Sequence, residues 1–80
     1  MPRPSDILCR RFGRAVRERR LELGLTQEAL AVRAKLNRSY ITDVERGARN
    51  IALVNMARLV RALDMTVIEF FRRYDLEGSE

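Results

Sequence analysis

The chain has 80 residues, which is enough for one small domain with a modest core. Its 16 basic and 11 acidic side chains give a net charge of +5, and all the basic residues except Lys35 are arginines. This balance favours a polyanionic partner, with nucleic acid ahead of a membrane surface. Arginine suits phosphates and base edges, although a bias for arginine over lysine also follows from genomic base composition alone.

The composition also excludes several classes of protein. No apolar run reaches the roughly 18 residues of a transmembrane helix, and the N-terminus MPRPSDIL lacks the apolar core of a signal peptide. Cys9 is the only cysteine and histidine is absent, so the chain offers no internal disulfide, zinc cluster or Ser/His or Cys/His nucleophile pair. We therefore expect a cytoplasmic protein that is not an enzyme and that uses no metal, cofactor or small-molecule ligand.

The predicted elements are all helices. We expect flexible tails at residues 1–5 and 76–80 on either side of one domain, residues 6–75. Ser5 or Asp6 can cap a first helix that runs to Leu23, where Gly24 ends it. Its apolar stripe consists of Leu8, Phe12, Ala15, Val16 and Leu23.

The stretch TQEALAVRAKLNRSYITDVERGAR, residues 26–49, is the most informative part of the chain. Thr26 can cap a second helix, and Asn37 can cap a third helix that Gly47 ends. A short apolar helix, a turn of three or four residues and a second short helix are the anatomy of a helix-turn-helix.

The third of these helices divides into two faces at 100° per residue. With Arg38 at zero, the polar side chains of Ser39, Thr42, Asp43 and Arg46 fall between about 0° and 140°. The opposite sector, between about 200° and 340°, holds Tyr40, Ile41, Val44 and Glu45. This pattern fits a recognition helix with one hydrogen-bonding face, and it also fits an ordinary amphipathic surface helix.

Two further helices complete the chain. A fourth, over about residues 53–63, aligns Leu53, Met56, Ala57, Val60 and Leu63. Thr66 and Glu69 form a capping box for a fifth, residues 67–74, which is apolar around most of its circumference. Such a helix either lies deep in the core or forms part of a subunit interface. We favour the interface, with Ile68 and Phe71 as its contacts.

The order of five helices, together with TQEALA, the turn and ITDVERG, resembles the phage-repressor or XRE-type helix-turn-helix family over roughly Phe12 to Phe71. The segments LNRSYITDVERGARN and VIEFF are most similar to the controller proteins of restriction–modification systems. This resemblance implies a compact, all-α, five-helix, lambda-repressor-like domain. It also implies a cofactor-free dimer that represses or activates transcription with its third helix in the major groove.

The resemblance further assigns roles to single residues. The family's base-reading positions correspond here to Arg38, Ser39, Thr42 and Asp43. Its DNA backbone contacts correspond to Gln27, Tyr40, Arg46 and Arg49. It also pairs Arg20 with Glu45, and their places at the edges of two apolar stripes support a partly buried structural ion pair.

Three residues depart from the family pattern. Lys35 stands where glycine is frequent and reaches a positive φ only at a cost, so we expect a locally different turn. Arg19 stands at a position that is often leucine and is expected to be solvated. Asp43 either accepts a hydrogen bond from cytosine N4 or orients Arg38 or Arg46, and the sequence leaves these alternatives open.

The sequence therefore predicts a homodimeric, sequence-specific transcription regulator that binds double-stranded DNA at a palindromic operator, with half-sites about one helical turn apart. One alternative is an antitoxin-like protein-interaction module that also binds DNA. A second is RNA binding, for which the few aromatic side chains provide no stacking platform.

Overall fold

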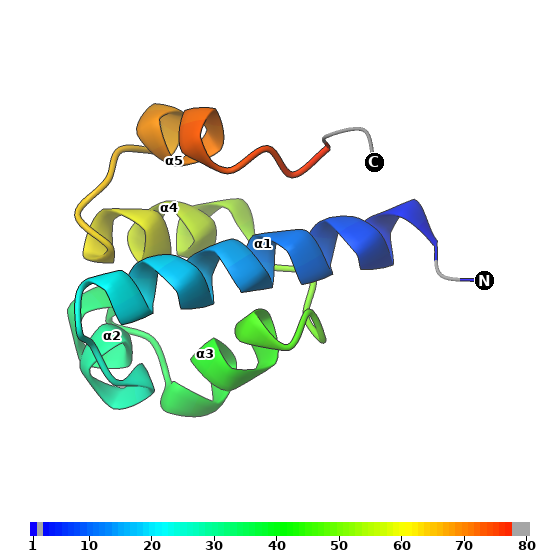
Figure 1. The fold of residues 1–80 in the computed structure, drawn as a ribbon. Helices are drawn as coiled ribbons and strands as arrows, with labels where there is room; N and C mark the ends of the chain where they lie inside the picture. Colours follow the sequence, from blue (N-terminus) through cyan, green and yellow to red (C-terminus); the bar gives the residue numbers. More distant parts are fainter. Residues whose placement is uncertain (2, 78–80) are drawn as a thin grey trace.

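The computed structural model describes residue 1 and residues 3–77, and it consists of five helices (Figure 1). They are α1 (Pro4–Glu22), α2 (Gln27–Ala34), α3 (Arg38–Glu45), α4 (Leu53–Ala62) and α5 (Val67–Arg73). The long helix α1 crosses the middle of the molecule, with α2 and α3 on one side and α5 on the other. The predicted all-α, five-helix architecture is confirmed. Among the described helices, none combines the length and the apolar character needed to cross a membrane.

The first helix begins earlier than expected. Pro4 occupies its first position, where the missing N–H is no loss, and the Asp6 carboxylate accepts a hydrogen bond from the Arg3 N–H at 3.1 Å. Asp6 therefore lies inside the first turn, and neither Ser5 nor Asp6 is the capping residue. Leu8 was expected in the apolar stripe but is 43% exposed, because the N-terminal end of α1 extends beyond the other helices.

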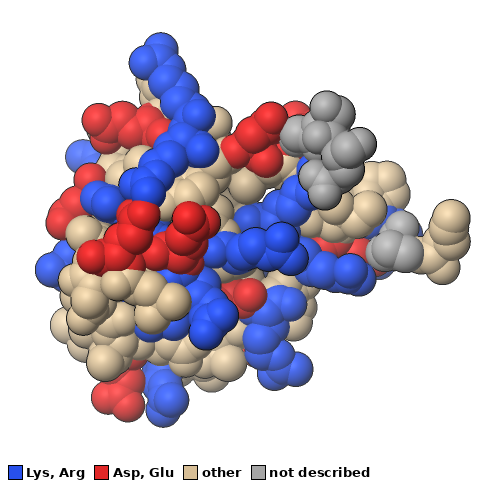
Figure 2. Space-filling view, in the orientation of Figure 1, with Lys and Arg blue, Asp and Glu red and all other residues tan. Residues whose placement is uncertain are grey.

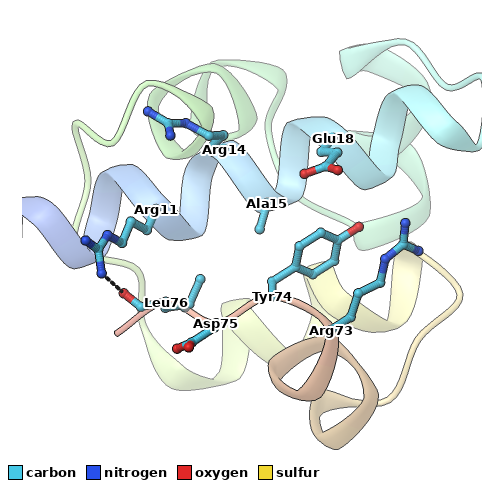
Figure 3. Close-up of a pocket in the computed structure, with 8 residues that line it drawn as sticks. All are labelled: Arg11, Arg14, Ala15, Glu18, Arg73, Tyr74, Asp75 and Leu76. Atoms are coloured by element: carbon cyan, nitrogen blue, oxygen red, sulfur yellow. Dashed lines mark hydrogen bonds between the residues drawn. The ribbon is translucent and has the colours of Figure 1, made fainter. Parts of the chain in front are cut away.

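The last described residues are packed against α1. The Arg11 guanidinium donates a hydrogen bond to the Leu76 carbonyl at 3.0 Å, and the Leu76 side chain lies against the core (Figure 3). Leu76 belongs to the tail, residues 76–80, that the sequence predicts to be flexible; residues 78–80 of that tail lie outside the described residues.

Tyr74 lies nearby with its hydroxyl near Glu18 and Arg73. That buried hydroxyl has no hydrogen-bond partner among the described residues, and burial raises the pKa of the Tyr74 phenol.

One core joins all five helices. Its fully buried side chains are Val16, Leu30, Ile41, Val44, Leu59, Val60, Leu63 and Phe70. The backbones of helices α1 and α3 are in direct contact at Gly13. A Cβ added to this residue would lie 2.1 Å from the Val44 carbonyl oxygen, so no larger residue fits without a shift. Leu53 was expected in the core but is 74% exposed, since α4 turns that side outward.

Arg19 is also placed differently from the expectation. Its side chain is only 19% exposed, and its Nε donates a hydrogen bond to the Leu63 carbonyl at 3.0 Å. The guanidinium thus satisfies a carbonyl at the C-terminal end of α4, where a leucine could not.

The turn between α2 and α3 keeps a left-handed residue without using glycine. Lys35 has φ 57° and ψ 42°, its N–H donates to the Val32 carbonyl at 3.2 Å, and the Leu36 N–H donates to the Ala31 carbonyl at 2.9 Å. These two bonds are the Schellman arrangement of a helix C-terminus. Lys35 therefore adopts the positive φ itself, at the steric cost that a Cβ carries in this conformation.

Replacing Lys35 by glycine should stabilise the protein. Lys35→Gly removes the steric cost of a Cβ at positive φ, and we expect a gain of about 0.5–1 kcal/mol in the free energy of unfolding. Urea unfolding followed by circular dichroism measures it. The control is Lys35→Ala, which loses the long side chain but keeps the Cβ. Equal stability of the glycine and alanine variants would contradict the idea of strain at this position.

Candidate nucleic-acid interface

The outward face of α3 carries the polar side chains that the sequence assigned to base reading. The Asn37 side chain caps the helix by accepting hydrogen bonds from the N–H and the hydroxyl of Ser39, both at 2.9 Å. Ile41 and Val44 anchor the opposite face, with exposures of 0% and 2%. Rigid anchoring on one side leaves the other side free to meet a ligand in a fixed orientation.

The expected ion pair between Arg20 and Glu45 is present and buried. The Arg20 Nε lies 2.7 Å from Glu45 Oε2, and its Nη2 lies 3.0 Å from Oε1, so the contact is bidentate. The side chains are 9% and 4% exposed. The remaining Nη1 donates to the Leu25 carbonyl at 2.8 Å. One guanidinium therefore holds together α1, the loop after it and the end of α3.

Gln27 and Thr42, both predicted to contact DNA, extend the hydrogen-bond network of Arg20 and Glu45. Gln27 Nε2 donates to Glu45 Oε1 at 3.1 Å, and the Thr42 hydroxyl donates to Gln27 Oε1 at 3.0 Å. The amide of Gln27 is thus oriented by a buried carboxylate, and within the described part of the chain its second N–H has no partner. The link between Gln27 and Thr42 was not predictable from the sequence, because the two residues belong to different helices.

A second cluster lies where α3 runs into the loop before α4. The Arg49 guanidinium is 3.4 Å from the Asp43 carboxylate and 4.5 Å from the centre of the Tyr40 ring. Asp43 therefore pairs with Arg49, and neither Arg38 nor Arg46 takes that place. The Tyr40 hydroxyl accepts a hydrogen bond from the side chain of Asn55 at 3.2 Å. Sequence reasoning missed Asn55, whose only signal is that it interrupts the apolar run at the start of α4.

Arg38 and Arg46 remain close to solvent. Arg38 Nη1 lies 3.5 Å from Glu28 Oε1, with side-chain exposures of 63% and 73%, so this surface pair contributes little to stability and can exchange for another partner. Arg46 follows α3 directly and is exposed. Figure 2 shows that arginine and lysine side chains cover much of this view of the molecule, with carboxylates among them.

The two residues assigned to the subunit interface lie apart from this face. Ile68 is 65% exposed and Phe71 is 39% exposed, while Phe70 between them is fully buried. Helix α5 packs on the opposite side of α1 from α3 (Figure 1). The structure therefore separates these apolar side chains from the polar face of α3.

Comparisons with known proteins agree with this geometry. Residues 16–70 match the family model described as helix-turn-helix. Control protein C.MunI of a Mycoplasma species is 35% identical over 74 residues, which are 91% of this chain and 99% of that protein. Control protein C.BamHI of Bacillus amyloliquefaciens is 45% identical over 53 residues, 65% of each chain, so the match spans about two thirds of its length.

Solved structures show the same fold. The restriction–modification controller protein C.AhdI from Aeromonas hydrophila has a TM-score of 0.75 and 48% identity, covering 79% of this chain and 96% of that one. The controller protein C.Esp1396I, solved as a tetramer with its natural 35 base-pair operator, has a TM-score of 0.80 and 31% identity, covering 84% and 88%.

Removing one partner of the buried pair should be strongly destabilising. Arg20→Ala leaves the Glu45 carboxylate buried without a counter-charge, and we expect a loss of about 3–5 kcal/mol in the free energy of unfolding. Arg38→Ala is the matched control, since it breaks only an exposed pair and should cost at most about 1 kcal/mol. Thermal and urea unfolding measure both. An Arg20→Ala protein with an unchanged melting temperature would rule out a structural role.

Proposed function

The chain belongs to the helix-turn-helix family and, within it, to the controller proteins of restriction–modification systems, and we propose that it is a transcription regulator that binds double-stranded operator DNA. One observation carries the proposal: the polar face of α3 is held in place by the buried network of Arg20, Glu45, Gln27 and Thr42. The proposed role requires no catalysis and no cofactor, and it places the protein in the cytoplasm. The antitoxin-like alternative is not favoured, because these relatives are described as control or controller proteins.

In this proposal the side chains of α3 read bases in the major groove. Arg38, at the start of the helix, would bind guanine O6 and N7 with its planar fork. Ser39 and Thr42 would contact neighbouring base edges, and Asp43 would accept from a cytosine N4 once Arg49 moves to the DNA. The exposure of Arg38 and its weak pairing with Glu28 support the first of these roles.

A second set of side chains would bind the DNA backbone and set the register. These are Gln27, Tyr40, Arg46 and Arg49. The second N–H of the Gln27 amide, which has no partner among residues 3–77, would donate to a phosphate, and the Tyr40 ring lies against the Arg49 guanidinium. Backbone contacts of this kind add affinity without reading sequence.

The regulator would act as a homodimer on a palindromic site. A two-fold interface uses the same surface on both subunits, and Ile68 and Phe71 of α5 provide exposed apolar side chains for it. Their position away from α3 supports this arrangement, because two recognition helices can then reach successive turns of the same face of DNA.

Selection from a random duplex library tests the proposed function. We expect an enriched palindrome whose half-sites are about 10 base pairs apart, centre to centre.

Arg38→Ala should then relax the base preference at one symmetric pair of positions in this palindrome, at a cost of about 1–3 kcal/mol per contact. Arg49→Ala should weaken binding to all sequences alike and lower the slope of log affinity against log salt. The assignment of Arg38 fails if its removal lowers binding uniformly and leaves the sequence preference intact.

The dimer has its own test. Ile68→Asp places a charge in the proposed apolar interface, so the variant should sediment as a monomer and bind the selected palindrome more weakly. Burial of two large apolar side chains per subunit, at about 1.5–3 kcal/mol each, has to offset the entropy of association, so we expect micromolar dimerisation. Val32→Asp is the matched control, since Val32 is equally apolar and 78% exposed on α2. A wild-type protein that is monomeric at high micromolar concentration and binds DNA one-to-one would refute the dimer.

A further inference from the structure

A groove with an apolar floor lies between α2 and α4. Its volume is about 690 Å³, and its apolar lining consists of Ala34 of α2 with Leu53, Val54, Ala57 and Ala62 of α4. Leu53 and Val54 are 74% and 63% exposed. These two neighbouring side chains present apolar surface to solvent at the edge of the groove.

Basic side chains stand on both walls of this groove. Arg33 and Lys35 belong to the C-terminal end of α2 and its turn, and Arg58 and Arg61 belong to α4. Arg33 reaches the Ala62 carbonyl at 3.3 Å and Asp64 at 3.6 Å. Within residues 3–77, Lys35, Arg58 and Arg61 make no hydrogen bond or ion pair through their side chains. Three basic side chains thus surround an apolar floor without a counter-charge.

Lys35 is the one groove-lining residue with a positive φ, which makes a matched glycine variant possible. Lys35 adopts φ 57°, a conformation that glycine reaches without steric cost. The left-handed conformation belongs to the C-terminal turn of α2 and does not depend on the lysine side chain, since Asp64 after α4 has φ 60° as well. Glycine can therefore replace Lys35 without disturbing the turn, and the replacement removes one basic side chain from the groove.

We propose that this groove is the docking site for an acidic amphipathic helix of a partner protein. The apolar stripe of such a helix would cover Leu53, Val54 and Ala57, and acidic residues on its two flanks would pair with the basic side chains on the two walls. A DNA backbone would satisfy the basic side chains but would leave the apolar floor uncovered. The lining shares no residue with the proposed DNA contacts.

The probe is a fluorescently labelled synthetic peptide of about 18 residues, which is long enough for a helix. It carries leucines at i, i+3, i+4 and i+7 spacing and glutamates elsewhere, with a covalent staple that holds the helix. The control peptide has the same composition, but its leucines are distributed around the helix. Titration of the full chain at about 0.15 M salt, where long-range charge effects are screened, is followed by anisotropy. We expect saturable binding of the first peptide and weaker binding of the second.

Matched variants separate the groove from general charge attraction. Arg58→Glu with Arg61→Glu should lower the affinity for the peptide by about tenfold or more. Arg14→Glu with Arg17→Glu makes the same change of net charge on the exposed side of α1, and it should leave the affinity within about twofold. Val54→Ser tests the apolar floor without any change of charge and should also weaken binding.

Lys35→Gly distinguishes binding from folding. This variant should be more stable than the natural chain and yet bind the peptide less tightly, so its loss of binding cannot come from unfolding. The proposal is wrong if the peptide fails to bind, if both peptides bind equally, or if the two charge-reversed proteins lose affinity to the same extent. It is also wrong if the Arg58 and Arg61 changes weaken duplex DNA binding and leave the peptide unaffected, since the basic walls would then serve the DNA backbone.

Discussion

The position of the polar face of α3 depends on one buried contact, the bidentate pair of Arg20 and Glu45. Removing two charges from water costs free energy that only a complete set of hydrogen bonds offsets. Here the set includes the Leu25 carbonyl and the Gln27 amide as well as the pair itself. Because these groups come from α1, its following loop, α2 and α3, a different arrangement of any one segment leaves a buried charge without its counter-charge or without one of its hydrogen bonds. We infer that the pair contributes more to the choice of a single arrangement than to stability.

The close approach of α1 and α3 makes this contact possible. Gly13 lies in the middle of α1, and the space that its Cβ would occupy holds the carbonyl oxygen of Val44. An alanine at this position would separate the two helices and draw Arg20 away from Glu45. The glycine weakens α1 as an isolated helix, and the tertiary contact that it permits compensates for this.

Local signals in the sequence were sufficient to predict the five helices, whereas contacts between residues distant in the chain could not be predicted from them. Thr26, Asn37 and Thr66 each accept a hydrogen bond at the start of a helix, as their side chains predicted. The exposure of Leu53 could not be read from α4, because apolar residues occupy several of its faces and the neighbouring helices decide which one is buried. The pairing of Asp43 with Arg49 likewise depends on how the loop after α3 folds back. The Arg20–Glu45 pair could be predicted only because the family resemblance pairs these two positions, which are distant in the chain.

The carboxylates beside the proposed DNA contacts have a consequence for how such a protein searches a genome. Arg38 forms an ion pair with Glu28, and Arg49 forms an ion pair with Asp43, so both arginines are paired with carboxylates of the protein before DNA binds. Any duplex must displace these carboxylates, and a random sequence returns only phosphate contacts in exchange. Displacement lowers the affinity for all sequences by the same factor, but in the proposed arrangement a correct site offers the released Asp43 carboxylate a hydrogen bond from cytosine N4. On random DNA that carboxylate stays unpaired beside the phosphates. The ratio of specific to non-specific binding thereby rises, and fewer molecules are retained on the large excess of wrong sites.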